Sequence, residues 1–215
     1  MPLNFSWSTF DVTDRFPEKW QADISAVVAE ADFRKFPRTP VLSREAPSVT
    51  HIERGRVHAD TVQQTLPWLY KLYRSDFLEL VARARAETVG PALDDRYGIV
   101  LNVQRGSRMR FECHVDSNPV TGLLFFTDHP AGGGEFVVGH DTEAIGVETL
   151  ERNCTVISAQ AGHLIVFDGK TYPHYARALR SEQDVRVVAV MNFYTGSCLE
   201  STRPRELNRH LFGDE

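Results

Sequence analysis

The chain has few cysteines, no long apolar segment and no excess of positive charge. Its three cysteines form no Cys-x-x-Cys pair and no even set, which argues against a secreted disulfide scaffold. No apolar run approaches the roughly 20 residues that a membrane-spanning helix needs. The first residues also lack the basic and then apolar stretches of a signal peptide. These absences predict a cytoplasmic protein with no membrane partner.

The overall charge narrows the possible partners further. The formal net charge is −5 at pH 7, which does not favour binding to the phosphate backbone of a nucleic acid. With 215 residues, the chain is long enough for one domain with a substantial core. We therefore expect a small-molecule partner and no nucleic acid, whereas the oligomeric state cannot be read from these features.

The hydrophobic pattern changes its period near the middle of the chain. Helical spacing of apolar residues is found in 15–35 and again from 60 to about 89, with a Pro- and Arg-containing irregular segment at 36–58. From residue 97 onward the pattern is that of short strands. In chain order, these are residues 97–104, 108–116, 120–127, 134–138, 154–158, 163–167, 173–178 and 185–194.

Eight short strands separated by turn signals are typical of a double antiparallel sheet. The sequence therefore predicts a mainly β protein with flanking helices, whose core is a double-stranded β-helix of the jelly-roll or cupin-like kind. We expect residues 1–95 to form a helical or irregular buttress and 96–200 the core. The charged residues 201–215 are expected to form a loosely ordered tail of the same single domain.

Two histidines and an aspartate are the strongest candidates for chemistry. In a strand, residues i and i+2 point to the same face, so His114 and Asp116 could bind one ion together. His174 lies too far along the chain to share that strand and would come from another. Two imidazoles and one carboxylate around one metal form the facial triad of non-haem iron(II) oxygenases. The sequence thus predicts a metal site made by His114, Asp116 and His174.

A second His-x-Asp pair, His58 and Asp60, has a simpler interpretation. It precedes a helical pattern, and Gln63 follows Asp60 by three residues, as in a capping box. We expect Asp60 to be a helix N-cap and not a metal ligand.

The span from about Gly98 to Tyr194 resembles the Fe(II)/2-oxoglutarate-dependent dioxygenases, especially the branch that is similar to prolyl 4-hydroxylase. That family has a His-x-Asp pair, an apolar strand, a Gly-Gly-Glu turn, a distal histidine and then a basic residue. The corresponding residues here are His114 and Asp116, Leu123–Phe126, Gly133–Glu135, His174 and Arg186. Five elements in the same order cover nearly half of the chain.

The resemblance implies a set of cofactors and a role for Arg186. The metal would be Fe(II), with 2-oxoglutarate as cosubstrate and O2 as oxidant, and Arg186 would bind the C5 carboxylate of 2-oxoglutarate through its planar fork. The family commonly has Ser or Thr two residues after this arginine, whereas this chain has Val188. Thr121 is the candidate for the missing hydroxyl. Retention of Asp116 favours hydroxylation, because the family's halogenases have a small residue there.

Three further residues are candidates for binding substrate. By alternation, Arg110 and Glu112 share a strand face with His114 and Asp116, and buried charges need a partner or a function. They could pair with each other or contact a polar substrate. Asn192 shares the face of Arg186 on the last strand and is a third candidate.

The sequence thus predicts an Fe(II)- and 2-oxoglutarate-dependent hydroxylase. No second domain for docking a protein is recognisable, which favours a small molecule such as an amino acid or a biosynthetic intermediate. Two alternatives stay open: a hydroxylase of peptide or protein side chains, and a non-enzymatic cupin-like protein that binds a metal or ligand.

Overall fold

The computed structural model describes residues 5–85 and 87–212. Along the chain, the helices and strands are β1 (Trp7–Asp11), η1 (Thr13–Arg15), α1 (Trp20–Val28), β2 (Asp32–Pro37), β3 (His51–Val57), α2 (Ala59–Thr65), α3 (Pro67–Arg74), α4 (Asp76–Ala84), β4 (Val89–Pro91), α5 (Asp95–Gly98), β5 (Ile99–Arg105), β6 (Val120–Phe125), β7 (Phe136–Gly139), α6 (Val147–Leu150), β8 (Cys154–Ile157), β9 (His163–Phe167), β10 (His174–Ala176), β11 (Val185–Thr195), η2 (Glu200–Thr202) and α7 (Arg205–Phe212).

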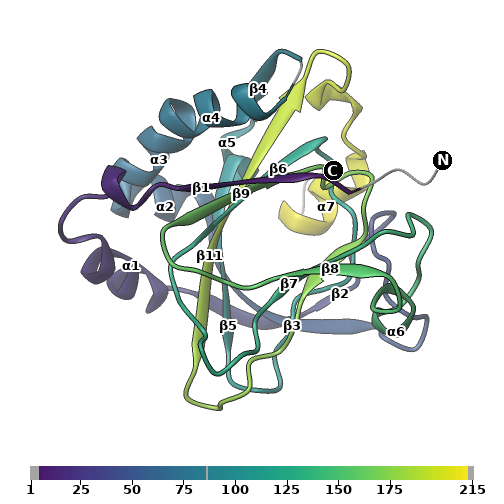
Figure 1. Cartoon of the computed structure of the whole chain (residues 1–215). Helices are drawn as coiled ribbons and strands as arrows, with labels where there is room; N and C mark the ends of the chain where they lie inside the picture. Colours follow the sequence, from purple (N-terminus) through teal and green to yellow (C-terminus); the bar gives the residue numbers. More distant parts are fainter. Residues whose placement is uncertain (1–4, 86, 213–215) are drawn as a thin grey trace.

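The strands form two antiparallel sheets. The larger sheet has the order β1-β9-β6-β11-β5-β3-β2, with β4 pairing β11, and the smaller one has the order β10-β7-β8. Figure 1 shows helices α1 to α4 grouped on one side of the larger sheet, with β7 and β8 on its other side. The predicted mainly β fold with a double-stranded β-helix core and buttressing helices is confirmed.

Side-chain alternation along β11 connects the two layers. Val187, Ala189 and Met191 belong to the core cluster that contains the helical residues. Val188 belongs instead to the cluster between the two sheets, as does Phe136 of β7. Since successive residues of a strand face opposite sides, Arg186 shares the face of Val188 and points into the space between the sheets.

The helical pattern of residues 60–89 corresponds to three short helices rather than one. Pro67 occupies the first turn of α3, where its missing N–H costs nothing. The apolar stripe nevertheless predicted the buried face correctly, because Leu69, Phe77 and Val81 all pack in the main core. The pattern over residues 15–35 was too long, since α1 ends at Val28 and β2 follows it.

The prediction that residues 36–58 are irregular was wrong. β3 occupies His51–Val57 and pairs with β2 on one side and β5 on the other. Two arginines, a glutamate and a histidine in this strand hide the apolar alternation on which the sequence prediction relied. β2 and β3 therefore extend the sheet whose central strands come from the second half of the chain.

The predicted strand at 108–116 was also wrong, although the segment is hydrogen bonded. Only His114 forms isolated β-bridges, one with Ser43 and one with His174. The backbone N–H of Phe111 donates to the carbonyl of Ala176 at 3.0 Å, and that of Val115 donates to Leu42 at 3.0 Å. The segment thus runs between β10 and an N-terminal loop without forming a regular ladder.

The C-terminal segment is more ordered than its charge suggested. Residues Arg205–Phe212 form α7, whose Leu207 is only 1% exposed. The expectation of a loosely ordered tail was therefore wrong for this helix, and the last three residues lie outside the described part of the chain. Within that part, no helix is both long and apolar enough to cross a membrane.

Candidate metal centre

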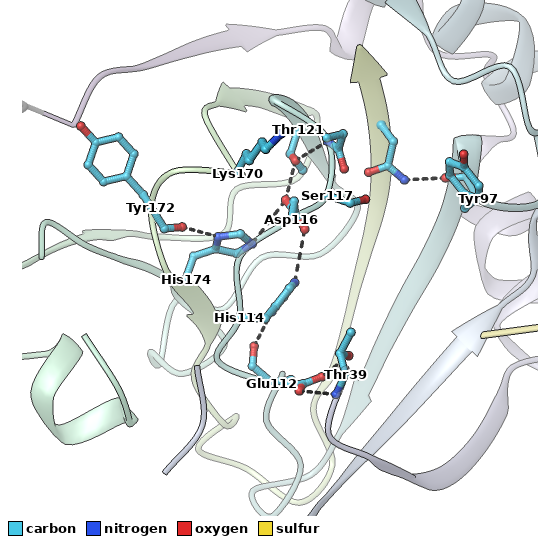
Figure 2. A network of polar contacts seen from close by, with 12 residues as sticks. Thr39, Tyr97, Glu112, His114, Asp116, Ser117, Thr121, Lys170, Tyr172 and His174 are labelled. Carbon is cyan, nitrogen blue, oxygen red and sulfur yellow. Dashed lines mark hydrogen bonds and ion pairs between the residues drawn. The ribbon is translucent and has the colours of Figure 1, made fainter. Parts of the chain in front are cut away.

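His114, Asp116 and His174 converge between the two sheets. One ligand atom from each lies within 4.8 Å of the others. The Nε2 atom of His114 is 3.4 Å from Asp116 Oδ1, and the Nε2 atom of His174 is 3.5 Å from Asp116 Oδ2. Figure 2 shows both imidazoles directed at the carboxylate. The structure therefore brings together the three residues that the sequence selected as metal ligands.

Backbone bonds hold the two histidines side by side. The N–H of His114 donates to the carbonyl of His174 at 3.0 Å, and the N–H of His174 donates back at 2.9 Å. This bridge joins the irregular segment before Asp116 to β10. The pairing of two chain-distant segments, rather than a single strand, sets the geometry of the cluster.

The orientation of each ring suits metal binding. Nδ1 of His114 is 2.7 Å from the carbonyl oxygen of Glu112, and Nδ1 of His174 is 2.9 Å from that of Tyr172. A carbonyl can only accept, so each Nδ1 carries a proton, and a ring in its neutral form then has its lone pair on the Nε2 that faces Asp116. Outer hydrogen bonds of this kind orient histidine ligands in metal sites.

The charge states of two members also suit ligation. Burial lowers the pKa of His174 to about 4, although Asp116 opposes the shift. Burial alone would raise the pKa of Asp116, but the nearby His174 and His114 outweigh it and lower this pKa below its usual value. At neutral pH the cluster therefore offers a neutral imidazole and an ionised carboxylate, the forms that bind metals.

Thr121 orients the carboxylate of the cluster. Its hydroxyl donates to Asp116 Oδ2 at 2.5 Å and accepts from the side-chain amide of Asn118 at 2.9 Å. The sequence prediction gave Thr121 to the distal carboxylate of 2-oxoglutarate, and that role stays a prediction. The contacts of the structure favour a role in fixing Asp116.

Gly169 allows the backbone to approach the cluster closely. Its carbonyl accepts from the N–H of Asp116 at 2.8 Å. A Cβ atom at this position would collide with Asp116 Oδ2 and Thr121 Oγ1. The sequence indicates only a turn after a strand at this position, and it does not indicate the close approach that requires a glycine.

We expect Gly169→Ala to weaken metal binding at least about tenfold, because the methyl group displaces a ligand and its outer hydrogen bond. Anaerobic titration with Fe(II) measures this effect. Gly196→Ala is the matched control, since a Cβ there meets nothing within 4 Å. Equal affinities in the two variants would contradict the proposed close approach.

Arg186 lies in the same cavity and forms no salt bridge with any residue that the structure describes. It is 2% exposed, and its Nη1 donates to Gln104 Oε1 at 3.1 Å. Its Nε has no hydrogen-bond partner among residues 5–85 and 87–212. Burial lowers the pKa of this arginine to about 10. A buried guanidinium with a free donor is suited to an anionic ligand.

A cavity joins Arg186 to the cluster. It contains about 380 Å³ of empty space, part of it open to solvent, and His114, Asp116 and His174 line it together with Arg186. The walls between them are mainly apolar, with Leu123, Phe136, Val188 and Val190. The cavity therefore offers a metal-binding end, a cationic end and an apolar middle.

Arg110 and Glu112 do not pair with each other. Arg110 forms a double salt bridge with Glu45, at 2.6 and 2.8 Å. Glu112 accepts hydrogen bonds from the N–H and hydroxyl of Thr39, at 2.8 and 2.7 Å. The suggestion of a mutual ion pair was thus wrong. Their role as substrate contacts stays a prediction, and these contacts favour a structural role instead.

Arg110→Gln is expected to destabilise the protein by about 3 kcal/mol, because it leaves the carboxylate of Glu45 buried and unpaired. That side chain is only 1% exposed and also accepts from the N–H of Cys113 at 2.6 Å. Urea unfolding measures the change. Arg83→Gln is the control, since its pair with Glu79 is exposed. Equal stabilities of the two variants would show that the Glu45 bridge contributes little.

The remaining candidates are placed as follows. Asn192 donates to the carbonyl of Tyr97 at 2.5 Å and lines a second cavity beside the cluster, so its substrate role stays a prediction. His58 and Asp60 belong to no metal-type cluster in the described residues. Asp60 lies one residue inside α2 rather than at its N-cap, which is His58, and it accepts from the N–H of Thr61.

Comparisons with known structures agree with the fold described above. No family model matches the sequence, and no curated protein does. Solved structures, in contrast, match nearly the whole chain. A 2OG-Fe(II) oxygenase family oxidoreductase from Burkholderia pseudomallei has a TM-score of 0.59 at 14% identity, covering 87% of this chain and 84% of its own.

Two further structures have the same architecture. The epimerase SnoN, in complex with Fe3+, alpha ketoglutarate and nogalamycin RO, gives a TM-score of 0.61 at 10% identity, covering 89% of this chain and 79% of its own. A prolyl 4-hydroxylase from Phytophthora capsici gives 0.54 at 14% identity, covering 89% and 59%.

The fold and the cluster define a double-stranded β-helix protein with a two-histidine, one-carboxylate site. Its fold is that of the 2-oxoglutarate- and Fe(II)-dependent oxygenases.

Proposed function

We propose that this protein is an Fe(II)- and 2-oxoglutarate-dependent oxygenase that hydroxylates a small molecule. The observation that carries the proposal is one cavity lined both by the His114, Asp116 and His174 cluster and by Arg186, a buried arginine that forms no salt bridge in the described part of the chain. Three protein ligands leave open positions for a cosubstrate and an oxidant. The arginine provides a site that binds a carboxylate, which a protein that only binds a metal does not need.

Each part of the cavity has a distinct role in this proposal. His114, Asp116 and His174 would hold the metal through two nitrogens and a carboxylate oxygen. Arg186 would bind the C5 carboxylate of 2-oxoglutarate, with Gln104 fixing one end of its guanidinium. When bound, the iron with 2-oxoglutarate and O2 supplies an oxidation that is coupled to formation of succinate and CO2.

The apolar wall between these two ends has a function of its own. Leu123, Phe136 and Val188 would surround the methylene groups of 2-oxoglutarate and exclude water. Exclusion of water strengthens the pairing between the guanidinium and the carboxylate. It also protects the reaction from side reactions with solvent.

Two observations bear on the reaction and its substrate. Asp116 is present and oriented, which supports hydroxylation over halogenation. SnoN, which has the same fold, carries alpha ketoglutarate and a small molecule in its structure, and the cavities here are of small-molecule size. The three free thiols of Cys113, Cys154 and Cys198 also support a reducing compartment such as the cytoplasm.

A screen of amino acids and biosynthetic intermediates tests the proposal. Succinate formation from 2-oxoglutarate, with a mass gain of one oxygen in the substrate, is the expected result. A prolyl-containing peptide in the same screen tests the alternative of side-chain hydroxylation. Metal binding without any turnover or binding of 2-oxoglutarate would instead support the cupin-like binding protein.

A further inference from the structure

A second cavity extends from the metal cluster, away from Arg186. It contains about 680 Å³ of empty space, part of it open to solvent, and His114 and Asp116 line it as they line the first. Three arginines, Arg54, Arg56 and Arg203, line the same space. The cluster thus lies between two cationic regions, and only one of them is used by the proposed cosubstrate.

Arg56 is buried and Arg54 is half-buried, and donor atoms of both lack hydrogen-bond partners among residues 5–85 and 87–212. Arg56 is 8% exposed, and its Nε has no hydrogen-bond partner in the described part of the chain. The same holds for Nε and Nη2 of Arg54, whose guanidinium lies 4.3 Å from the ring centre of Phe36. Buried donors are normally satisfied in folded proteins, so these groups point to a ligand.

No carboxylate of the described residues neutralises this pair. Glu112 is the acidic group that influences Arg54, but its oxygens are bound by Thr39, and it forms no salt bridge within 4.0 Å in residues 5–85 and 87–212. Burial, and to a smaller extent the neighbouring Arg54, Arg203 and Arg34, lower the pKa of Arg56 to about 9. Like charges held together out of water favour an anion between them.

The third arginine, Arg203, belongs to the C-terminal segment and is held in place by three contacts. The guanidinium of Arg203 lies 3.9 Å from the ring centre of Tyr97, and it donates to Asn208 of α7 and to Ser117. Leu207 and Leu211 of α7 close the same cavity. The segment predicted as a tail therefore forms part of the wall of this cavity, which His114 and Asp116 also line.

We propose that the substrate is a small molecule with an anionic group, a carboxylate or a phosphate, bound by Arg54 and Arg56 with help from Arg203. This inference rests on the proposed function, because it gives the substrate of the same metal site. The anion anchors one end of the molecule, and the cavity leads the other end to His114 and Asp116. Arg186 stays free for 2-oxoglutarate.

Isothermal titration of the Fe(II)- and 2-oxoglutarate-loaded protein without oxygen tests this inference. Sulfate represents the tetrahedral anions and acetate the carboxylates, while 2-oxoglutarate occupies Arg186. We expect saturable binding of one of them, with a dissociation constant at least about tenfold higher in Arg56→Gln and Arg54→Gln. Arg83→Gln is the control, because its side chain is 72% exposed, pairs with Glu79 and does not line the cavity.

Two results would overturn the inference. The first is a wild-type protein that binds neither anion saturably, or binds it equally well in all variants. The second is a lowered melting temperature of Arg56→Gln without added anion, since a structural arginine stabilises the empty protein whereas an unpaired one does not. A missing 2-oxoglutarate absorption band in the wild type would refute the proposed function instead, and so the two failures are distinguishable.

The substrate screen gives an independent readout. Each acid in it is compared with its primary amide, which keeps the shape but removes the charge. Coupled turnover is expected for acids or phosphate esters and not for the amides. Turnover of an amide at the rate of its acid would contradict the anionic anchor even if the metal chemistry is correct.

Discussion

Replacement of His174 by alanine is expected to abolish the visible absorption band that forms when 2-oxoglutarate is added to the anaerobic Fe(II) protein. The band requires a metal bound by protein and cosubstrate together. In the proposed site His174 is one of three protein ligands, and its Nε2 lies 3.5 Å from Asp116 Oδ2. With two ligands left, the affinity for iron should fall by orders of magnitude, and turnover should disappear with it.

His58→Ala is the matched control for this experiment. His58 belongs to the other His-x-Asp pair of the sequence, and it contacts Asp32 at 3.9 Å on the surface of the protein. Its removal should leave the band unchanged. A band of undiminished strength in His174→Ala, or its loss in His58→Ala, would show that the wrong histidine had been assigned to the metal.

The sequence was informative about this cluster because few residue types can do its chemistry. His114 and Asp116 are separated by one residue, and His174 is the first residue of β10, directly after Pro173. The strand predicted around His114 and Asp116, however, was wrong, whereas the strand predicted around His174 is β10. The segment at 108–116 obtains its hydrogen bonds from β10 and from residues near Leu42, and no local pattern encodes such distant partners.

Charged residues show more clearly that a local pattern does not encode partners from distant parts of the chain. Arg110 and Glu112 satisfied the alternation of a strand face, and so they were predicted to share an environment. Their partners, Glu45 and Thr39, lie in the N-terminal half of the chain, in a segment that the sequence described as irregular. The sequence does not mark Arg54 and Arg56 as candidates, because surface arginines are common and only their burial makes these two unusual.

Apolar periodicity was reliable where one face of an element meets the core. The stripe that includes Leu69 and Phe77 predicted the buried side of the helices, and the apolar run of β11 predicted the central strand of the larger sheet. Helix boundaries were predicted less well. The break at Leu66 follows from Pro67, because proline disfavours a helical conformation in the residue before it. The break at Ser75 has no such signal in the sequence.

The second large effect is expected at Arg186. Substitution by lysine keeps a positive charge but replaces the planar fork by a single ammonium group. The guanidinium is 2% exposed, and its Nε lacks a partner in the described residues, so a carboxylate ligand would gain bonds there that lysine cannot reproduce. Each charge-assisted bond contributes about 1.5–3 kcal/mol, which corresponds to at least about tenfold in affinity.

The Michaelis constant of Arg186→Lys for 2-oxoglutarate should therefore rise at least about tenfold, while Fe(II) binding is retained because no metal ligand is changed. Steady-state succinate formation at varied 2-oxoglutarate, together with anaerobic iron titration, separates the two quantities.

Arg180→Lys is the control, since Arg180 is exposed and donates to the carbonyl of Ala131 at 2.9 Å outside the cavity. If Arg186→Lys and Arg180→Lys have the same Michaelis constant as the wild type, Arg186 does not bind the cosubstrate. If iron binding is lost as well, the buried guanidinium maintains the cavity itself, and its loss disturbs the metal ligands that line the same space.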